Sequence, residues 1–537
     1  MRRAERLMSN PERVPLSGFF VAVIFGAAAI LAGALCVASA ARAETVPPDS
    51  WVYEALKSFE LRGLVRLEPT LPYTFEQCET YTREIAVNVE KEHVVLGPRH
   101  AFLLERLTKQ FVGTRDRPED RWSKPVYVAR EDERFFAMDF GVGGIVQRKA
   151  DERKGEADGF FIPDFLLGLG HNVTMETDYR VTIAPERGSN ANEEKPSARL
   201  RSYRGLTAEF ERAVLDAGGS WWEVRVGREY MHWGTSLRED LILSQTAGSL
   251  DHVGARFDLG PFEMSTCQAS LDVSTRRHLA GHRLTLALPR GAFLGLSETV
   301  VYASRDFDFK YLSPLSIFYA QQFNEGTNAD NILWSFDWKV PLHRGFIFYG
   351  EFLVDDLQYQ RDEKAGPDRL GLYAAADALF MVWGRELELS GGYTFISRFT
   401  YAHSGGTEYV TGNGDERMNH LLGSPMGPDA DRSFIKGTLG VSSRTALTLE
   451  GASTRYGEAG VLAQGALLDW LPGMENGHTF YLSAPVLYVK YASASLRYDL
   501  NHGSYVSAGA WMRFRDPGVT DFQKRQLLGW LEVVLDL

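Results

Sequence analysis

The last eleven residues of this 537-residue chain, 527–537, constrain its fold more than any other stretch. From Leu531 to Leu537 every odd position is apolar, whereas Glu532 and Asp536 occupy even positions. Side chains alternate between the two faces of a strand, so this segment predicts a strand with one apolar face. A terminal strand that is apolar on one face and more polar on the other is typical of the strand that closes a transmembrane β-barrel.

The N-terminus predicts export from the cytoplasm. Arg2, Arg3 and Arg6 precede an uncharged apolar stretch over 18–37, and Ala41 and Ala43 offer small residues to a signal peptidase. This pattern predicts a signal peptide over 1–43, cleaved before Glu44. An uncleaved helical anchor is the alternative, because about 20 apolar residues can span a bilayer.

Charge and cysteine content exclude several classes of function. Residues 1–43 carry five Lys/Arg and two Asp/Glu, so their removal changes the net charge from −12 to −15. An acidic chain is a poor partner for nucleic acid, which favours a basic face. Cys78 and Cys267 then remain, far apart in sequence, and are interpreted as free or buried thiols. No zinc-binding pattern is present, and no metal or other cofactor is expected.

Residues 44–132 predict a small helical bundle and a linker. Ser50 or Asp49 can cap a first helix that ends at Gly63. Residues 74–77, which read TFEQ, form a capping box for a second helix. A third helix is expected to open at Gly97 and Pro98.

From residue 133 to the end, the pattern changes to period two. Trp222, Val224 and Val226, for example, alternate with Glu223 and Arg225. In a membrane barrel the apolar face is turned outward to lipid and the polar face lines the lumen. At about 20–25 residues per strand with its connection, 133–537 has room for roughly 16–20 antiparallel strands. Polar stretches at 184–198, 361–368, 403–417 and 423–432 are expected to be loops, with 184–198 and 403–417 on the external surface.

Two polar and aromatic clusters are candidate ligand sites. Residues 227–234 read GREYMHWG and bring together Arg228, His232 and Trp233, with Arg238 shortly after. Aromatic faces and charged groups hold polar ligands such as sugars by stacking and charge-assisted hydrogen bonds. The structural alternative is an inward Arg–Glu pair and an interfacial Trp that only stabilise the barrel.

The second cluster contains Tyr311, Asn331 and Trp334. Asp330 and Asn331 have oxygens that suit a sugar hydroxyl or a calcium ion, but Asn and Asp are also common turn residues, and the turn interpretation is the stronger one.

The sequence contains no nucleophile elbow, zinc-protease helix or phosphate-binding loop. A barrel hydrolase needs a serine and a histidine that meet in space. His232, Ser236 and Ser244 are present, but isolated residues of these types are usually structural. The chain is therefore not expected to be an enzyme.

Several short motifs, taken in order, resemble the Wzi family of outer-membrane capsule-assembly proteins. They are 227–234 with the LILS of 241–244, LAGHRL at 279–284, GLSET at 295–299, YLSP at 311–314, DN at 330–331 and YGEF at 349–352. The N-terminal SWVYEAL at 50–56 and RGLV at 62–65 are similar to the start of that family. One departure is the terminal Leu537, where many barrels end in Phe.

The resemblance implies a closed barrel of about eighteen strands with a periplasmic helical bundle. It also implies a non-enzymatic, lectin-like role in binding capsular or other surface polysaccharide and supporting capsule assembly or attachment. The expected partners are that polysaccharide, outer-membrane lipid and, during biogenesis, the barrel-assembly machinery, and a monomer is expected. The helices also resemble an S-layer-homology module, which keeps a diffusion porin open as an alternative.

Overall fold

The fold is given by a computed structural model. It describes residues 44–47, 50–115, 117–150, 155–170, 173–183, 206–236, 239–325, 330–357, 367–403, 406–412, 420–458, 481–500, 503–516 and 525–536.

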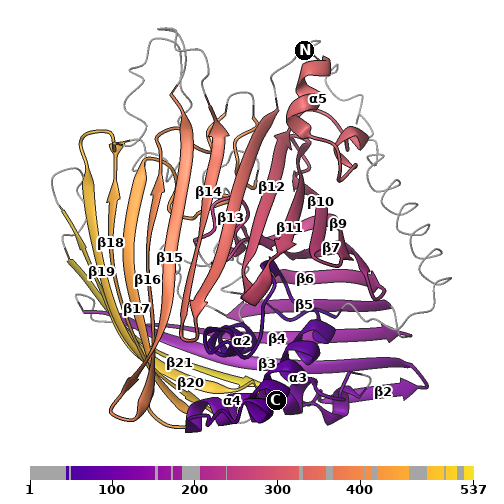
Figure 1. Ribbon diagram of the computed structural model, residues 1–537, viewed down its shortest axis with the longest axis vertical. Helices are drawn as coiled ribbons and strands as arrows, with labels where there is room; N and C mark the ends of the chain where they lie inside the picture. The colour runs from indigo at the N-terminus through magenta and orange to yellow at the C-terminus, as the bar shows by residue number, and fades with distance from the viewer. Residues whose placement is uncertain are drawn as a thin grey trace, which may run out of the picture.

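Eighteen antiparallel strands form one closed barrel (Figure 1). The first half of the wall is built by β3 (Arg134–Lys149), β4 (Glu156–Leu169), β5 (Val173–Ile183), β6 (Leu206–Gly218), β7 (Trp222–Tyr230), β9 (Ser249–Leu259), β10 (Phe262–Asp272), β11 (Arg277–Ala287) and β12 (Phe293–Tyr302). The second half is built by β13 (Asn331–His343), β14 (Phe346–Asp356), β15 (Arg369–Val382), β16 (Arg385–Ile396), β17 (Ala430–Gly440), β18 (Thr445–Tyr456), β19 (Leu487–Asp499), β20 (Tyr505–Arg515) and β21 (Arg525–Asp536). The predicted all-β barrel of about eighteen strands is confirmed.

The terminal strand closes the barrel, as its alternation predicted. β21 pairs with β3 from Leu528 opposite Lys149 to Asp536 opposite Gly141. A short strand, β2 (Tyr127–Glu131), pairs with the first residues of β3, which β21 does not reach. Leu537, the predicted last residue of this strand, lies outside the described residues.

The outer face of the wall is apolar. Five side chains that are partners on successive strands are each 37–45% exposed: Leu284, Leu296, Phe336, Phe352 and Leu372. The side chains that alternate with them, such as Arg283, Asp337 and Glu351, are at most 1% exposed and face the lumen. We call the outward row, with its apolar neighbours on the other strands, the apolar belt. The same alternation places Trp222, Val224 and Val226 outside and Glu223 and Arg225 inside.

The two ends of the barrel differ in their connections. At one end, the short-turn end, the strands are joined by two to five residues, for example 260–261 and 344–345. The other end, the long-loop end, carries the connections 231–248, 303–330 and 397–429.

A helical module lies at the short-turn end (Figure 1). Its helices are α2 (Trp51–Leu61), α3 (Phe75–Lys91) and α4 (Pro98–Phe111). Ser50 caps α2, Thr74 and Gln77 form the predicted capping box of α3, and Gly97 precedes Pro98 at the start of α4. These three predicted helix starts are confirmed. None of the helices in the described part of the chain is long and apolar enough to cross a membrane.

The module is bonded to strands on opposite sides of the barrel. On one side, Arg99 pairs with Asp499 of β19 at 2.6 Å and Lys57 with Asp377 of β15 at 3.4 Å. On the other side, Thr45 donates its backbone N–H to Glu176 of β5 and accepts from Arg212 of β6. These bonds fix the module across the short-turn mouth.

The position of Ile435 in the apolar belt makes a stability prediction. Ile435 is 55% exposed near the middle of β17, and an arginine there would place a charge in lipid. We expect Ile435→Arg to lower the free energy of unfolding in bilayers by about 2–4 kcal/mol. Urea titration of the reconstituted protein measures this, and Ile435→Leu is the matched control, expected within about 0.5 kcal/mol of the parent. Equal stability of the two variants would contradict the outward assignment.

His100 makes the docking of the module pH-dependent. Burial lowers its pKa, but hydrogen bonds from the imidazole to Glu386 and Glu388 outweigh burial and the nearby Arg62, so the net pKa is raised. A raised pKa means that the stabilisation is full below the unfolded value of about 6.5 and is lost as pH rises through the folded pKa.

Hydrogen exchange of α4 should therefore accelerate as pH rises through the folded pKa of His100, after correction for the intrinsic pH dependence of exchange. In His100→Gln this extra acceleration should disappear. An unchanged profile in that variant would assign the effect to another group.

Candidate functional site

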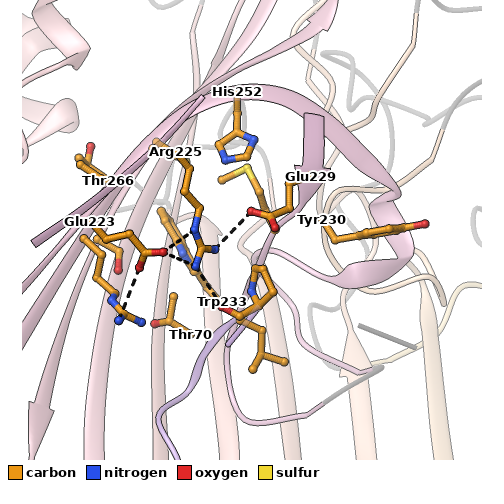
Figure 2. Close-up of a pocket in the computed structure, with 16 residues that line it drawn as sticks. Thr70, Glu223, Arg225, Glu229, Tyr230, Trp233, His252 and Thr266 are labelled. Atoms are coloured by element: carbon orange, nitrogen blue, oxygen red, sulfur yellow. Dashed lines mark hydrogen bonds and ion pairs between the residues drawn. The ribbon is translucent and has the colours of Figure 1, made fainter. Parts of the chain in front are cut away.

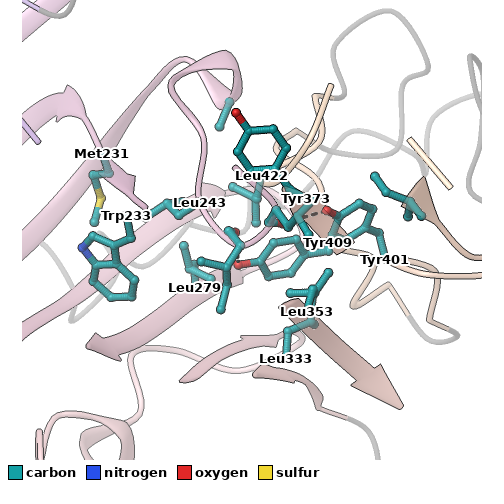
Figure 3. Close-up of a cluster of buried hydrophobic side chains, with 14 of the residues drawn as sticks. Met231, Trp233, Leu243, Leu279, Leu333, Leu353, Tyr373, Tyr401, Tyr409 and Leu422 are labelled. Atoms are coloured by element: carbon teal, nitrogen blue, oxygen red, sulfur yellow. Dashed lines mark hydrogen bonds between the residues drawn. The ribbon is translucent and has the colours of Figure 1, made fainter. Parts of the chain in front are cut away.

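Two connections at the long-loop end turn back into the lumen and pack there. We call their described residues, 231–236, 239–248, 397–403, 406–412 and 420–429, the plug. Leu241, Ile242 and Leu243 are fully buried, and they pack with Tyr401 and Tyr409 from the second connection (Figure 3). Wall residues such as Leu279 and Leu333 complete one continuous apolar core.

Glu351 of β14 holds the plug to the wall. Its carboxylate accepts the backbone N–H groups of Leu241 at 2.5 Å and Ile242 at 3.0 Å. The Ser335 hydroxyl of β13 donates to the same carboxylate at 2.5 Å. A fully buried carboxylate thus replaces the water that two backbone donors have lost.

Two tyrosines satisfy the carbonyl groups of the same two residues. Tyr401 and Tyr409 donate their hydroxyls to the carbonyl oxygens of Leu241 and Ile242, each at 2.7 Å. Their rings are stacked with centroids 5.7 Å apart. Burial raises the pKa of both hydroxyls, so they remain protonated donors. All four backbone groups of residues 241 and 242 are therefore paired with side chains.

The second connection is anchored by two lumen-facing side chains at the long-loop end. Arg277 of β11 donates to the carbonyls of Gly412 and Glu408 at 2.6 Å each. Asn331 of β13 donates to the carbonyl of Thr407 at 3.0 Å. The expectation that 403–417 forms external surface is wrong for the described residues 406–412, because Tyr409 and its neighbours are buried inside. The polar stretch 423–432 likewise enters the plug and the first residues of β17.

The helical module reaches the plug from the other side. The short strand β1 (Thr70–Leu71) pairs with β8 (His232–Trp233), and Gly234 donates its N–H to the carbonyl of Pro69. His232 is 2% exposed and its Nε2 lies 2.8 Å from Asp240. Ser236 accepts a hydrogen bond from the N–H of Glu239, so its hydroxyl serves the local turn.

A compact charge network surrounds this junction (Figure 2). Arg225 lies 2.6 Å from Glu223, 3.3 Å from Glu229 and 3.2 Å from Asp216. Arg256 pairs with Glu223 at 3.5 Å. The adjoining cavity has a volume of about 60 Å³, and a second cavity beside His232 and Lys57 has about 50 Å³. Each has room for a few water molecules and is far below the size of a small-molecule site.

The structure distributes the predicted ligand-binding residues over both faces of the wall. His232, Trp233 and Asn331 lie in the lumen, where Trp233 is 3% exposed in the plug core. Arg228 lies on the outer face and pairs with Asp251 at 2.8 Å, so the alternative of an inward Arg228–Glu229 pair is wrong. Arg238 lies outside the described residues.

Tyr311 and Trp334 share a cluster on the outer wall with Tyr302 and Phe318. Tyr311 is fully buried and donates its hydroxyl to Asp330 at 2.5 Å. The second sequence cluster is therefore divided by the wall, with Asn331 inside and Tyr311 and Trp334 outside. Sequence reasoning also missed Glu351, Tyr401 and Tyr409, although Glu351 belongs to the YGEF motif.

Cys78 and Cys267 are free and buried, in agreement with the prediction. The described residues contain no group of three or more His, Cys, Asp or Glu side chains that could hold a metal ion.

Comparison with known proteins identifies the fold. No protein-family model and no curated protein sequence matches the chain. Among solved structures, it is similar to Escherichia coli Wzi, described as an outer-membrane protein involved in group 1 capsule assembly and a carbohydrate-binding β-barrel. The identity is 13%, the match covers 92% of this chain and 100% of that one, and the TM-score is 0.58. The fold is thus a β-barrel similar to that of Wzi.

Two Pseudomonas aeruginosa barrels also match, each with lower scores. OccD3 is 9% identical, and the match covers 78% of this chain and 94% of that one with a TM-score of 0.44. OccK2 in complex with glucuronate is 10% identical, and the match covers 75% of this chain and 96% of that one with a TM-score of 0.43.

The hydrogen bonds of Glu351 predict how the plug responds to mutation. Glu351→Ala leaves two buried N–H groups unpaired, at a cost of about 1–3 kcal/mol. We expect hydrogen exchange in peptides covering 239–247 to accelerate roughly ten- to a hundredfold, while β17–β20 exchange as before. Ser335→Ala is the control, because it removes one donor and leaves both amides paired, so its effect should be smaller. Unchanged exchange in Glu351→Ala would show that the plug does not depend on this carboxylate.

Proposed function

We propose that this outer-membrane barrel binds capsular or other exopolysaccharide at the cell surface and supports capsule assembly or attachment. Short turns are periplasmic and long loops extracellular in barrels of this class. The helical module would then lie in the periplasm and the plug below the external loops. The similarity to Wzi, whose description includes carbohydrate binding, supports this proposal.

The observation that carries the proposal is the plug, which occupies the lumen against β10–β16. A diffusion porin needs a water-filled channel. Here the plug forms a continuous core against β10–β16, and the module is bonded to strands on both sides of the short-turn mouth. These features oppose free diffusion and favour a receptor.

A polymer is the ligand that suits a plugged barrel at a cell surface. A single sugar gains little from exposed hydrogen bonds, because water competes for the same groups. A repeating polymer can engage several weak sites, and effective concentration raises its avidity. The net charge, −12 for the whole sequence and −15 after removal of the expected signal peptide, would repel an acidic polymer at long range, so local arginines must offset it. Arg238 remains a candidate for this role.

The contacts of the two candidate catalytic residues fit structural roles. His232 directs Nε2 at Asp240, and Ser236 accepts the backbone N–H of Glu239, so both side chains help to hold the fold of the plug. Binding is therefore the function that we propose.

Deletion of the gene, followed by measurement of cell-bound and shed polysaccharide, tests the proposal. We expect a shift from cell-bound to shed polymer, restored by the parent gene, and capture of that polymer by the purified protein. Unchanged retention of polysaccharide on the deletion strain, with no polymer captured by the purified protein, would overturn the receptor proposal.

Conductance in planar bilayers separates the receptor from the diffusion porin. Little conductance is expected from the parent protein. A large steady channel would favour the porin with an S-layer-homology-like module, and hydrolysis of lipid or glycan by the purified protein would contradict both.

A further inference from the structure

The connection between β12 and β13 is folded down against the outside of the barrel. We call its described residues, 303–325 and 330, the strap. Arg305 forms a bidentate pair with Asp330 at 2.9 and 2.5 Å, and Tyr311 donates to the same carboxylate. These bonds join the two ends of the strap.

The helix of the strap is fastened to the wall. The N–H groups of Phe318 and Tyr319, at the start of α5 (Phe318–Glu325), donate to the carboxylate of Glu298 on β12 at 2.8 and 2.9 Å. The Phe318 ring packs on His282 of β11 with centroids 4.3 Å apart. In Figure 1, α5 lies beside the wall at the end opposite α2–α4.

The strap covers outward-facing positions that would otherwise belong to the apolar belt. Ala280, Val300 and Ile332 are direct partners across β11, β12 and β13, and they are only 0–8% exposed. Tyr302 is also fully buried on this face, although the face points away from the lumen. The strap has therefore replaced the wall as the outer surface here.

The length of β12 fixes where this surface lies. A barrel presents an apolar band about 25 Å tall, which needs about 9–11 tilted strand residues. β12 runs from Phe293 to Tyr302. All of its residues from Glu298 onward are buried, so its outer face is open only over 293–297. The open part is about half of what the band needs. The remaining height on this side must come from the strap.

The strap presents apolar side chains to its surroundings. Five of its large side chains are 46–78% exposed: Phe309, Leu312, Leu315, Ile317 and Tyr319. Three of its charged groups pair within the strap, since Arg305 and Lys310 lie 3.1 and 3.3 Å from Asp308, whereas Asp306 pairs at 3.8 Å with Arg276 of the neighbouring turn. An exposed apolar patch of this kind marks an interaction surface.

We propose that the strap is a lipid-contacting element that completes the apolar belt over β11–β13 and packs against acyl chains of the outer leaflet. Leu284, Leu296 and Phe336, at 39–45% exposure, lie next to it on the same three strands, so the patch continues the lipid-facing surface. This inference rests on the barrel's membrane placement and is independent of the polysaccharide. The patch is thus neither an aqueous loop nor a protein-docking site.

Site-directed spin labelling of the full-length protein in phospholipid vesicles tests the inference. A nitroxide is attached to Leu315→Cys, and its collisions with oxygen, which concentrates in lipid, are compared with those of a water-soluble nickel chelate. Leu284→Cys in the apolar belt is the lipid reference. Val95→Cys is the aqueous reference, because Val95 is 92% exposed on the helical module. The parent protein, labelled in parallel, gives the background from its own three cysteines, of which Cys78 and Cys267 are at most 2% exposed.

We expect Leu315→Cys to give a ratio of oxygen to nickel collisions like that of Leu284→Cys. A ratio like that of Val95→Cys would overturn the proposal in favour of an aqueous loop. Low collision rates with both reagents would overturn it in favour of cover by protein, including a second copy. Ile317→Cys provides the same measurement where Leu315→Cys does not yield a heat-modifiable, folded barrel.

Discussion

The structure depends on one constraint: a backbone amide or carbonyl that leaves water must find another partner. In the wall the constraint is met by closure of the barrel. β21 and β2 both pair with β3, so the backbone groups along this edge of β3 have partners. Inside the lumen no ladder is available for residues 241 and 242. There Glu351 of β14, with Tyr401 and Tyr409 of the second connection, supplies the four missing partners.

Features governed by local rules could be predicted from the sequence. The period-two alternation predicted the barrel and its outward face, and the capping residues Ser50 and Thr74 predicted where two helices begin. The course of 397–429 could not be predicted, because a polar, glycine-containing stretch looks the same whether it faces water or a polar lumen. Its burial depends on partners such as Arg277, which is more than a hundred residues away.

The candidate site was harder to predict because neighbours in a strand face opposite ways. Asn331 binds the plug inside the barrel, whereas Trp334, three residues later on β13, lies outside beneath the strap. Arg228 and Glu229 are separated by the same rule. A cluster that is dense in sequence is therefore divided by the wall, and only residues two apart could have formed a common surface. The YGEF motif did contain a key residue, but its role depends on a contact 110 positions away in sequence.

The internal charges also limit where an acidic polymer could bind. Arg212 and Arg283 are buried and the side chain of Arg225 is only 13% exposed, and each pairs with at least one carboxylate of the wall. Breaking such a pair leaves a buried charge without compensation, which is costly, so these arginines are committed to the fold. The carboxylates around the module junction would further repel an anionic chain that entered from the short-turn end. Under the proposed function, attraction for an acidic polysaccharide would therefore have to arise at the long-loop rim, where weak contacts can add along the polymer.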